Sequence, residues 1–253
     1  PDALPKLSPR LGDFVRTNNE ALIGVLAPDS SERFSDGVAI TSILHTDAHS
    51  HIEPVRYGEG SDFFRLLTLP HAPGKTFPTR AFGAAKAFLQ QPALWWRALA
   101  SRQWSTHTQI LLYMRTLEST LKLRLGRSAF TGFRRGLETK LGDPSEAPQA
   151  FMEEANALAR RFAEKVGGVE MTMFTELLRG VPSTAHILGG CCMGANAEEG
   201  VIDAQHRVHG YDGLYVIDGA AMSANPGVNP SLTITAMAER ALSFVPPKAS
   251  VHA

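Results

Sequence analysis

Alternating apolar and polar positions dominate the first half of the chain and predict strands with one solvent-facing side. One antiparallel hairpin is predicted over residues 37–43 and 50–57. A second is predicted over residues 106–114 and 117–125, where the leucines of the second segment alternate with lysine and arginine. These patterns indicate antiparallel sheets that are half buried.

Three segments instead repeat apolar residues at helical spacing. Residues 80–102 predict a helix that Pro92 interrupts, because proline lacks the backbone donor that a helix interior needs. Residues 143–167 predict a surface helix with a capping-type start at Ser145 and a glycine stop. A final helix is predicted over residues 230–244, ahead of two consecutive prolines.

The order of these elements divides the chain into four parts. Residues 1–36 are rich in Pro, Ser, Asp and Asn and are interpreted as a linker with one short apolar piece. Residues 37–183 predict an α+β domain, an antiparallel sheet with helices. Residues 184–246 predict a strand and a helix that complete a separate α/β domain, and residues 247–253 are expected to be a tail.

Composition indicates a soluble globular chain without overall charge. Hydrophobic residues make up 43% and charged residues 20%, and 25 basic residues balance 25 acidic ones. No global field therefore attracts nucleic acid or an anionic membrane, which leaves only local contact with a lipid surface open. No apolar run of about 18 residues predicts a transmembrane segment. The adjacent Cys191 and Cys192 are too close in sequence to bridge each other and are expected to be small buried thiols.

Three segments near the C-terminal end carry residue types suited to alcohol chemistry. His186 lies in a His-Ile-Leu-Gly-Gly-Cys turn, and an imidazole can take or hold a hydroxyl proton near neutral pH. A short apolar strand predicted over residues 214–217 ends at Asp218 and Gly219, as strands do when they deliver a polar group to the edge of an α/β sheet. Asn229 stands where the last helix is predicted to begin.

These segments, in this order and spacing, resemble the C-terminal signature of the glucose-methanol-choline (GMC) oxidoreductases over residues 183–245. Within that family the resemblance is to the cholesterol-oxidase-like branch, whose members hold FAD and oxidise alcohols. Weaker similarity covers residues 7–24, 52–61 and 108–124. The Gly-x-Gly-x-x-Gly turn with which the family holds the FAD pyrophosphate does not occur in this sequence. We therefore expect the chain to be the C-terminal portion of a longer enzyme, with an N-terminal FAD-binding half as its partner.

The resemblance implies a role for each candidate residue. His186 would accept the hydroxyl proton while hydride passes to the flavin, and Asn229 would orient the hydroxyl and the flavin edge. Pro230 would occupy the first helical position, so that the N–H groups near Ser231 and Leu232 stabilise charge on the flavin. The other residues implied to border FAD are Gly189, Gly190, Asp218 and Gly219.

Each assignment has a simpler structural alternative. His186 would also suit a core or turn position, Asn229 an N-cap, and Asp218 with Gly219 a chain reversal. Glu53 loosely resembles the active-site glutamate of cholesterol oxidases, which as a buried carboxylate with a raised pKa would move a C–H proton. The alternative for Glu53 is a solvated strand residue.

Two further patterns allow more than one interpretation. A weak metal site is geometrically possible at three neighbouring histidines, although no metal is expected. The three tryptophans would either line a lipophilic cavity or belong to a helix core. These residues are His45, His49, His51, Trp95, Trp96 and Trp104.

The expected function is FAD-dependent oxidation of the CH–OH group of a sterol or another lipophilic alcohol to a ketone or aldehyde. Two alternatives are a dehydrogenase that acts on a small polar alcohol and a flavin-free binding domain derived from such an enzyme. Peroxide formation would separate the first alternative from an oxidase, and flavin absorbance would separate the second. The sequence does not decide the compartment.

Overall fold

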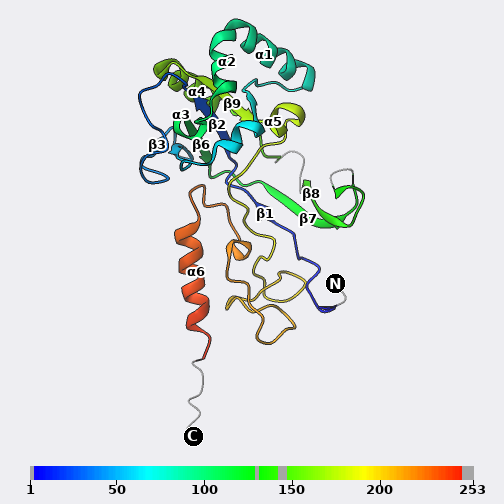
Figure 1. Ribbon diagram of the computed structural model, residues 1–253. Helices are drawn as coiled ribbons and strands as arrows, with labels where there is room; N and C mark the ends of the chain where they lie inside the picture. Colours follow the sequence, from blue (N-terminus) through cyan, green and yellow to red (C-terminus); the bar gives the residue numbers. More distant parts are fainter. Residues whose placement is uncertain (1–2, 129–130, 142–146, 247–253) are drawn as a thin grey trace. The chain divides into compact units, whose positions relative to one another are not determined.

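The computed structural model describes residues 3–128, 131–141 and 147–246. The chain forms two compact units, and each unit uses segments that lie far apart in sequence (Figure 1). Unit 1 comprises Pro1–Asn18, Thr116–Ala147 and His186–Ala253, and unit 2 comprises Asn19–Arg115 and Pro148–Ala185.

Unit 2 is built on a six-stranded sheet in the order β3-β4-β6-β2-β9-β5. All of its neighbouring strands run antiparallel, which confirms the antiparallel α+β prediction. The strands are β2 (Ala21–Leu26), β3 (Leu44–His45), β4 (Ser50–Val55), β5 (Thr68–Pro70), β6 (Thr108–Arg115) and β9 (Val169–Met173).

Helices cover both faces of this sheet. They are η1 (Asp62–Leu67), α1 (Phe77–Gln90), α2 (Pro92–Ala100), α3 (Trp104–His107), α4 (Glu153–Val166) and α5 (Phe174–Arg179). The predicted interruption at Pro92 is confirmed, because this proline opens α2, where its missing N–H costs no hydrogen bond. α4 ends as predicted at Gly167, whose φ of 65° is a left-handed conformation that glycine adopts without strain.

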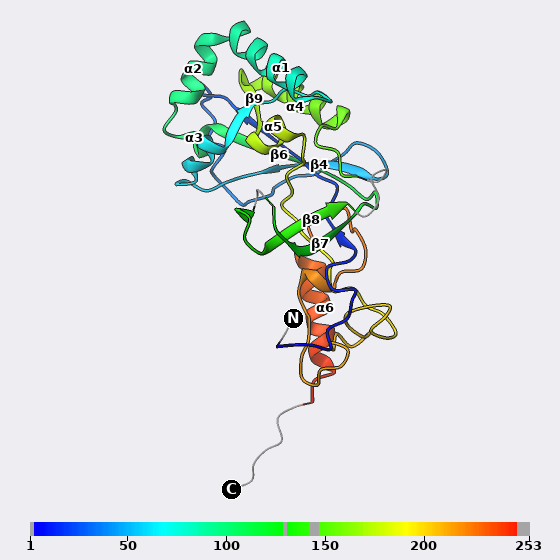
Figure 2. The same ribbon diagram turned by 90° about the vertical axis from the view of Figure 1, so that its right-hand side faces the viewer.

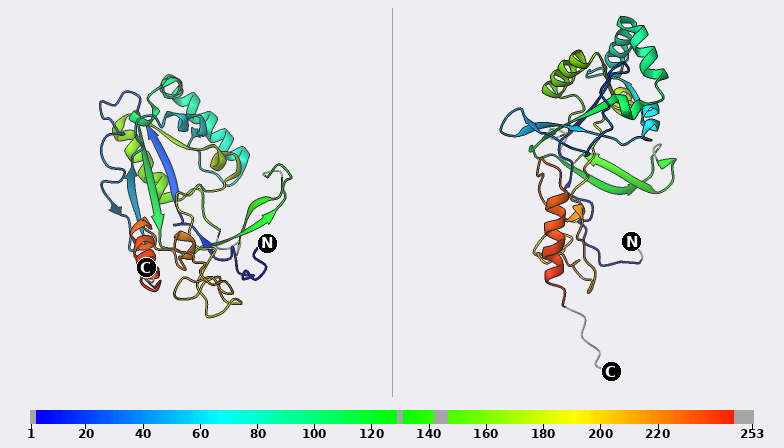
Figure 3. Two further views of the ribbon diagram at one scale, coloured as in Figure 1. Left: turned by 60° about the horizontal axis from the view of Figure 1, so that its bottom comes forward. Right: turned by 60° about the vertical axis from the view of Figure 1, so that its left-hand side comes forward.

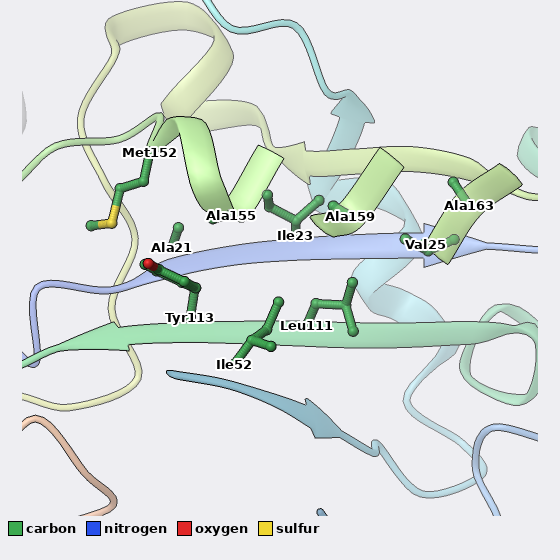
Figure 4. Packing of buried hydrophobic residues seen from close by; sticks show 10 residues of the cluster. All are labelled: Ala21, Ile23, Val25, Ile52, Leu111, Tyr113, Met152, Ala155, Ala159 and Ala163. Atoms are coloured by element: carbon green, nitrogen blue, oxygen red, sulfur yellow. The ribbon is translucent and has the colours of Figure 1, made fainter. Parts of the chain in front are cut away.

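The central strand β2 separates two buried clusters. Ala21, Ile23 and Val25 point toward α4, whose alanines at 155, 159 and 163 recur every four residues and let the helix lie close to the sheet (Figure 4). Leu22 and Leu26 point to the other face, where they meet residues of α2 and α3. Figure 3 shows α4 on one side of the sheet and α1 with α2 on the other.

Unit 1 holds a small sheet and one long helix. Its three strands are β1 (Val15–Arg16), β7 (Thr120–Gly126) and β8 (Gly136–Leu141), in the order β1-β7-β8. Its helices are the 3-10 turn η4 (Gly219–Ala221) and α6 (Ser231–Ser243), which stands out in Figure 2. Within the described part of the chain, no helix has the length and apolarity to cross a membrane.

The interpretation of residues 1–36 as a linker is wrong for its second half. Residues 21–26 form the buried strand β2, which pairs with β6 and β9. The compact units divide between Asn18 and Asn19. Polar and turn-forming residues around a short apolar run resemble a linker, but long-range pairing with β6 buries this run on both faces.

The second predicted hairpin is also wrong. β6 and β7 do follow one another, but β6 pairs with β2 and β4 whereas β7 pairs with β1 and β8. Alternation shows which face of a strand is buried and does not reveal its partner. In the first predicted hairpin, β4 is confirmed. Of residues 37–43, Ile40 forms only an isolated antiparallel bridge with Val55, and the strand β3 that pairs with β4 lies at Leu44–His45.

Two other boundaries differ from the sequence prediction. The Ser145 start lies outside the described residues, and α4 begins only at Glu153. The predicted strand over residues 214–217 is reduced to an isolated bridge between Arg207 and Tyr215. Among the described residues, residues 214–217 form backbone hydrogen bonds only with the nearby residues 206–208, and this pairing is too short to form a strand.

His71, which follows β5, gives the protein a predicted sensitivity to acid. Burial lowers the pKa of His71 from 6.5 to about 4, and its Nε2 lies 2.8 Å from Oδ1 of Asn156. The unfolded chain takes up a proton as pH falls through 6.5, whereas the folded chain does so only near pH 4. The free energy of unfolding is therefore expected to fall by about 3 kcal/mol across this window.

Urea unfolding at neutral pH and near pH 4 measures this loss. The variant His71→Gln should lose this part of the acid sensitivity, while His49→Gln, at an exposed histidine, should keep it. Equal pH dependence in the His71→Gln variant and the unsubstituted protein would assign the effect to other groups.

Candidate active site

The His186 turn and the loop before α6 meet through one buried side chain in unit 1. Nδ2 of Asn18 lies 3.2 Å from Nδ1 of His186 and donates a hydrogen bond of 2.8 Å to the carbonyl of Val228. Asn18 is fully buried. Because Val228 directly precedes Asn229, the two segments that the sequence singled out lie against the same amide. The sequence contains no motif around Asn18 that would have signalled this role.

This contact also determines the tautomer of the imidazole. The amide nitrogen of Asn18 only donates, so Nδ1 of His186 accepts, and in the neutral ring Nε2 carries the proton. In this form Nε2 can donate a hydrogen bond to an alcohol or ketone oxygen. Of the two roles open to a histidine here, the geometry favours holding the oxygen over taking its proton.

In unit 2, two buried carboxylates hold the segment that leads to His186. Glu20 accepts hydrogen bonds from the Thr184 hydroxyl at 2.8 Å and from the backbone N–H of Ala185 at 2.9 Å. Glu176 accepts one from the backbone N–H of Ser183 at 2.9 Å. Burial raises the pKa of Glu176, although its hydrogen bonds oppose this shift. The sequence analysis missed both carboxylates, because nothing in their local pattern distinguishes a buried glutamate from a surface one.

The glycines predicted to border FAD lie together in unit 1. The N–H of Gly189 donates to the carbonyl of Gly219 at 2.9 Å, and the carbonyl of Gly190 accepts from Gly12 at 2.7 Å. Asp218 caps η4, since its carboxylate accepts the N–H of Ala220 at 2.9 Å. Asp218 therefore has the turn role that was its structural alternative, and its exposed carboxylate lies beside this glycine pair.

The start of α6 differs from the prediction by one residue. Pro230 rather than Asn229 occupies the N-cap position, because its carbonyl already accepts the N–H of Ile234 at 2.8 Å. Among the described residues, no side chain caps this helix and no acidic residue lies in its first turn. The first N–H groups, at Ser231 and Leu232, therefore suit an electron-rich ligand atom such as a flavin carbonyl.

Glu53 lies on β4 in unit 2 and is not a solvated residue. Its side chain is only 6% exposed, and Oε1 lies 3.3 Å from Nε2 of His51, which is equally buried. Burial lowers the pKa of His51, and the neighbouring carboxylate opposes this shift without overcoming it. The pair is thus a buried carboxylate beside a neutral imidazole.

On the face of the sheet opposite α4, unit 2 encloses an apolar pocket of about 200 Å³. Its apolar wall includes Leu22, Tyr57, Phe64, Trp104, Ile110 and Met171. Ser183, Thr184 and Ala185, the segment held by the two carboxylates, form another part of the wall. Trp104 lines the pocket and Trp95 lies in the core, so each fits one of the two interpretations, whereas Trp96 is exposed and fits neither.

The structure gives less support to a metal site, to a role for the cysteines, or to a site in the remaining hollow. Within the ranges that the structure describes, no cluster of three or more His, Cys, Asp or Glu side chains could hold a metal ion. Cys191 and Cys192 are both free thiols, as expected, and burial raises the pKa of Cys191. A larger hollow of about 470 Å³ in unit 1, near Asp203 and Arg207, is open and holds none of the candidate residues.

Comparison with known proteins identifies the family of this chain. The family model described as GMC oxidoreductase matches residues 99–238, more than half of the chain. The chain belongs to the GMC oxidoreductase family. Members of this family are flavoproteins that normally depend on FAD.

Two curated relatives match nearly the whole chain. A cholesterol oxidase from Acinetobacter baumannii is 40% identical over 246 residues, which is 97% of this chain and 44% of that protein. A cholesterol oxidase from Mycobacterium tuberculosis is 43% identical over 251 residues, which is 97% of this chain and 43% of that protein. This GMC chain thus spans less than half the length of either relative.

Among solved structures, pyridoxine 4-oxidase from Mesorbium loti aligns with a TM-score of 0.47 and 14% sequence identity. The alignment covers 94% of this chain and 44% of that one.

Asn18 provides a test of the tautomer in this GMC oxidoreductase. The variant Asn18→Asp replaces a donor by an acceptor, so Nδ1 of His186 is expected to take the proton and Nε2 to lose it. The ¹⁵N chemical shifts of the ring nitrogens report this change directly. Alcohol oxidation should fall about 10-fold, the equivalent of one hydrogen bond of ordinary strength. Unchanged nitrogen shifts would contradict the assigned tautomer.

Glu20 provides a test of the segment before His186. In Glu20→Gln an NH₂ group replaces one acceptor oxygen, which leaves the Thr184 hydroxyl or the Ala185 N–H facing a donor. We expect the free energy of unfolding in urea to fall by about 2 kcal/mol. Glu32→Gln, at an exposed glutamate of the same unit, is the matched control and should cost nothing measurable. Equal stability of the two variants would show that Glu20 does not hold this segment.

Proposed function

We propose that this chain is the C-terminal, substrate-handling part of an FAD-dependent enzyme that oxidises the CH–OH group of a sterol or another lipophilic alcohol. The observation that carries the proposal is the 40–43% identity to two cholesterol oxidases over 97% of the chain. The motifs at His186 and Asn229 support it, because both segments contact the amide of Asn18.

The pocket in unit 2 supports the lipophilic substrate class. Leucine, isoleucine, methionine and aromatic side chains make up most of its wall, and its polar residues are Thr68, Thr172, Ser183 and Thr184. Its volume of about 200 Å³ lies below the ~300–1,000 Å³ of pockets that hold drug-sized ligands. A complete sterol ring system would therefore require part of the wall to move outward.

The chain's own residues supply the following chemistry in this proposal. FAD, when bound, would accept the hydride from the carbinol carbon. Nε2 of His186 would donate a hydrogen bond to the substrate oxygen and hold it while the carbon is oxidised, and the hydroxyl proton would pass to a water molecule as the hydride leaves. Asn229 orients the hydroxyl, and the first N–H groups of α6 stabilise electron density on the flavin edge.

The other candidate residues have proposed roles of their own. Gly189, Gly190 and Gly219 form the backbone surface along which the flavin would lie, with Asp218 at its border. Glu53 takes a proton from the carbon next to a newly formed ketone. It returns this proton to the far carbon of an adjacent C=C double bond, so that the double bond is isomerised. The side chain of Glu53 is shielded from water and lies beside His51, and this position supports the role.

The pyrophosphate of FAD would be held by a further segment of the enzyme. The two cholesterol oxidases are more than twice as long as the part that this chain matches. We propose that an N-terminal FAD-binding half is the chain's partner.

The direct test is an activity measurement on the purified protein, supplied with that half if necessary. Peroxide is measured in the presence of oxygen with a sterol, a long-chain alcohol and a small polar alcohol. Sterol or long-chain turnover with flavin absorbance is the expected result. Turnover of the small polar alcohol alone would refute the lipophilic class. A folded protein without flavin or turnover would favour a binding domain.

A further inference from the structure

We propose that α1, α2 and η1 dock unit 2 onto an anionic lipid surface, from which a lipophilic alcohol enters the pocket. The inference rests on the lipophilic substrate class of the proposed function. All three elements belong to unit 2. α1 and α2 lie on the face of the sheet opposite α4 (Figures 1 and 3).

The helices carry large apolar side chains on their outward faces. Phe82 and Leu89, seven residues apart on one side of α1, are 72% and 76% exposed. On α2, Trp96 is 71% exposed, whereas its neighbour Trp95 is buried in the core. A helix that packs only against its own domain has a polar outer face, so these faces are suited to an apolar partner.

The charges of the same region select an anionic partner. The sequence has no Asp or Glu between Asp62 and Glu118, although acidic and basic residues balance over the whole chain. Exposed basic residues in this stretch are Lys75, Lys86, Arg97 and Arg102, of which Arg97 is ion-paired with Asp29. Apolar side chains with interspersed cations are the combination that lies on an anionic lipid interface. An apolar protein groove would not require the cations.

A chain of aromatic side chains joins this surface to the pocket. Phe63 and Leu66 of η1 are exposed, and Phe63 stacks on Phe64 with ring centroids 4.3 Å apart. Phe64 lines the pocket and stacks on Tyr57, another lining residue, at 4.8 Å. An apolar molecule that leaves the lipid beside η1 therefore finds apolar contacts as far as the pocket wall.

Tryptophan fluorescence tests the docking directly. The protein has three tryptophans, and Trp95 and Trp104 are only 3% and 1% exposed, so a change caused by lipid comes from Trp96. Vesicles of phosphatidylcholine containing phosphatidylglycerol should shift the emission to the blue, and pure phosphatidylcholine should do so far less. Trp96→Phe should abolish the shift but preserve co-sedimentation with the vesicles.

Substitutions separate the apolar contribution from the charged one. The triple variant Phe82→Ser, Leu89→Ser, Trp96→Ser should lose co-sedimentation. The matched control Val38→Ser, Ile43→Ser, Leu44→Ser replaces exposed apolar residues elsewhere in unit 2 and should keep it. Replacing Lys75, Lys86 and Arg102 by glutamine should weaken binding to anionic vesicles on the order of 100-fold, or about fivefold per cation.

Several results would overturn the inference. Failure to bind anionic vesicles, equal binding to neutral ones, or unchanged binding of the first triple variant would each do so. The inference would also be overturned if acrylamide failed to quench the fluorescence of Trp96 before lipid is added, because another segment would then cover this side chain. A dimer that only the first triple variant dissociates would assign the surface to a second copy.

The proposed function is tested separately. Turnover of a detergent-dispersed alcohol without vesicle binding removes only the docking inference. Vesicle binding without any alcohol oxidation refutes the proposed function.

Discussion

Replacing His186 by alanine is expected to lower kcat/KM for the proposed alcohol oxidation by about 10²–10³-fold, the usual cost of removing one preorganised hydrogen-bond donor at a reacting oxygen. The imidazole is held at Nδ1 by the buried amide of Asn18, which also holds the carbonyl of Val228. Alanine removes the group that meets the substrate oxygen, and no neighbouring substitution can restore it. The measurement is steady-state peroxide formation by the enzyme assembled with its FAD.

Two controls accompany this variant. Flavin absorbance per protein should stay the same, because His186 is not among the groups proposed to hold FAD. His49→Ala, at an exposed histidine, should retain activity. Activity of His186→Ala within a factor of about two of the unsubstituted enzyme would refute the catalytic assignment.

Replacing Gly189 by alanine is expected to destabilise unit 1 by roughly 2–5 kcal/mol. Gly189 has a φ of 75°, and an added Cβ would lie 2.1 Å from the carbonyl oxygen of Phe14. The left-handed conformation costs alanine about 1–2 kcal/mol, and overpacking against fixed backbone adds about 1–3 kcal/mol. Phe14 is followed by β1, so its carbonyl cannot easily retreat. Urea unfolding measures the loss.

Gly213 is a matched control in the same unit. Its φ of 74° is nearly the same, but nothing lies within 4 Å of its Cβ position. Gly213→Ala should therefore cost only the conformational part, about 1–2 kcal/mol. Equal losses in the two variants would show that the approach of Phe14 does not matter.

Gly189 was singled out as a residue that borders the flavin, but the fold itself also requires glycine at this position. The resemblance implied that Gly189 borders the FAD. The structure shows that an added Cβ would collide with the protein's own backbone, which by itself requires glycine. The flavin contact remains a proposal, because Gly189 is explained without it.

Local pattern predicted the helices better than the sheets. The interruption at Pro92 and the glycine end of α4 depend on neighbouring residues only, and both were predicted correctly. β2 was assigned to a linker, and β7 to a hairpin with β6, because strand partners come from distant parts of the chain. A period of two identifies a strand but does not identify its neighbour.

The candidate site shows the same division. His186 and Asn229 were singled out from motifs that are local in sequence. Asn18 and Glu20, which hold their segments, lie more than 150 residues from the His186 turn and belong to no such motif. A buried glutamate that accepts backbone N–H groups has the same sequence signature as one in water.

By itself, the sequence determined the antiparallel α+β class, the GMC resemblance and the residue types that suit alcohol chemistry, because each depends on composition, periodicity or short motifs. Only the tertiary structure decided which strands pair, which glycine meets Phe14 and which nitrogen of His186 carries its proton. These depend on contacts between distant segments. Burial gives such contacts their energy, and burial is a property of the folded chain rather than of any local stretch.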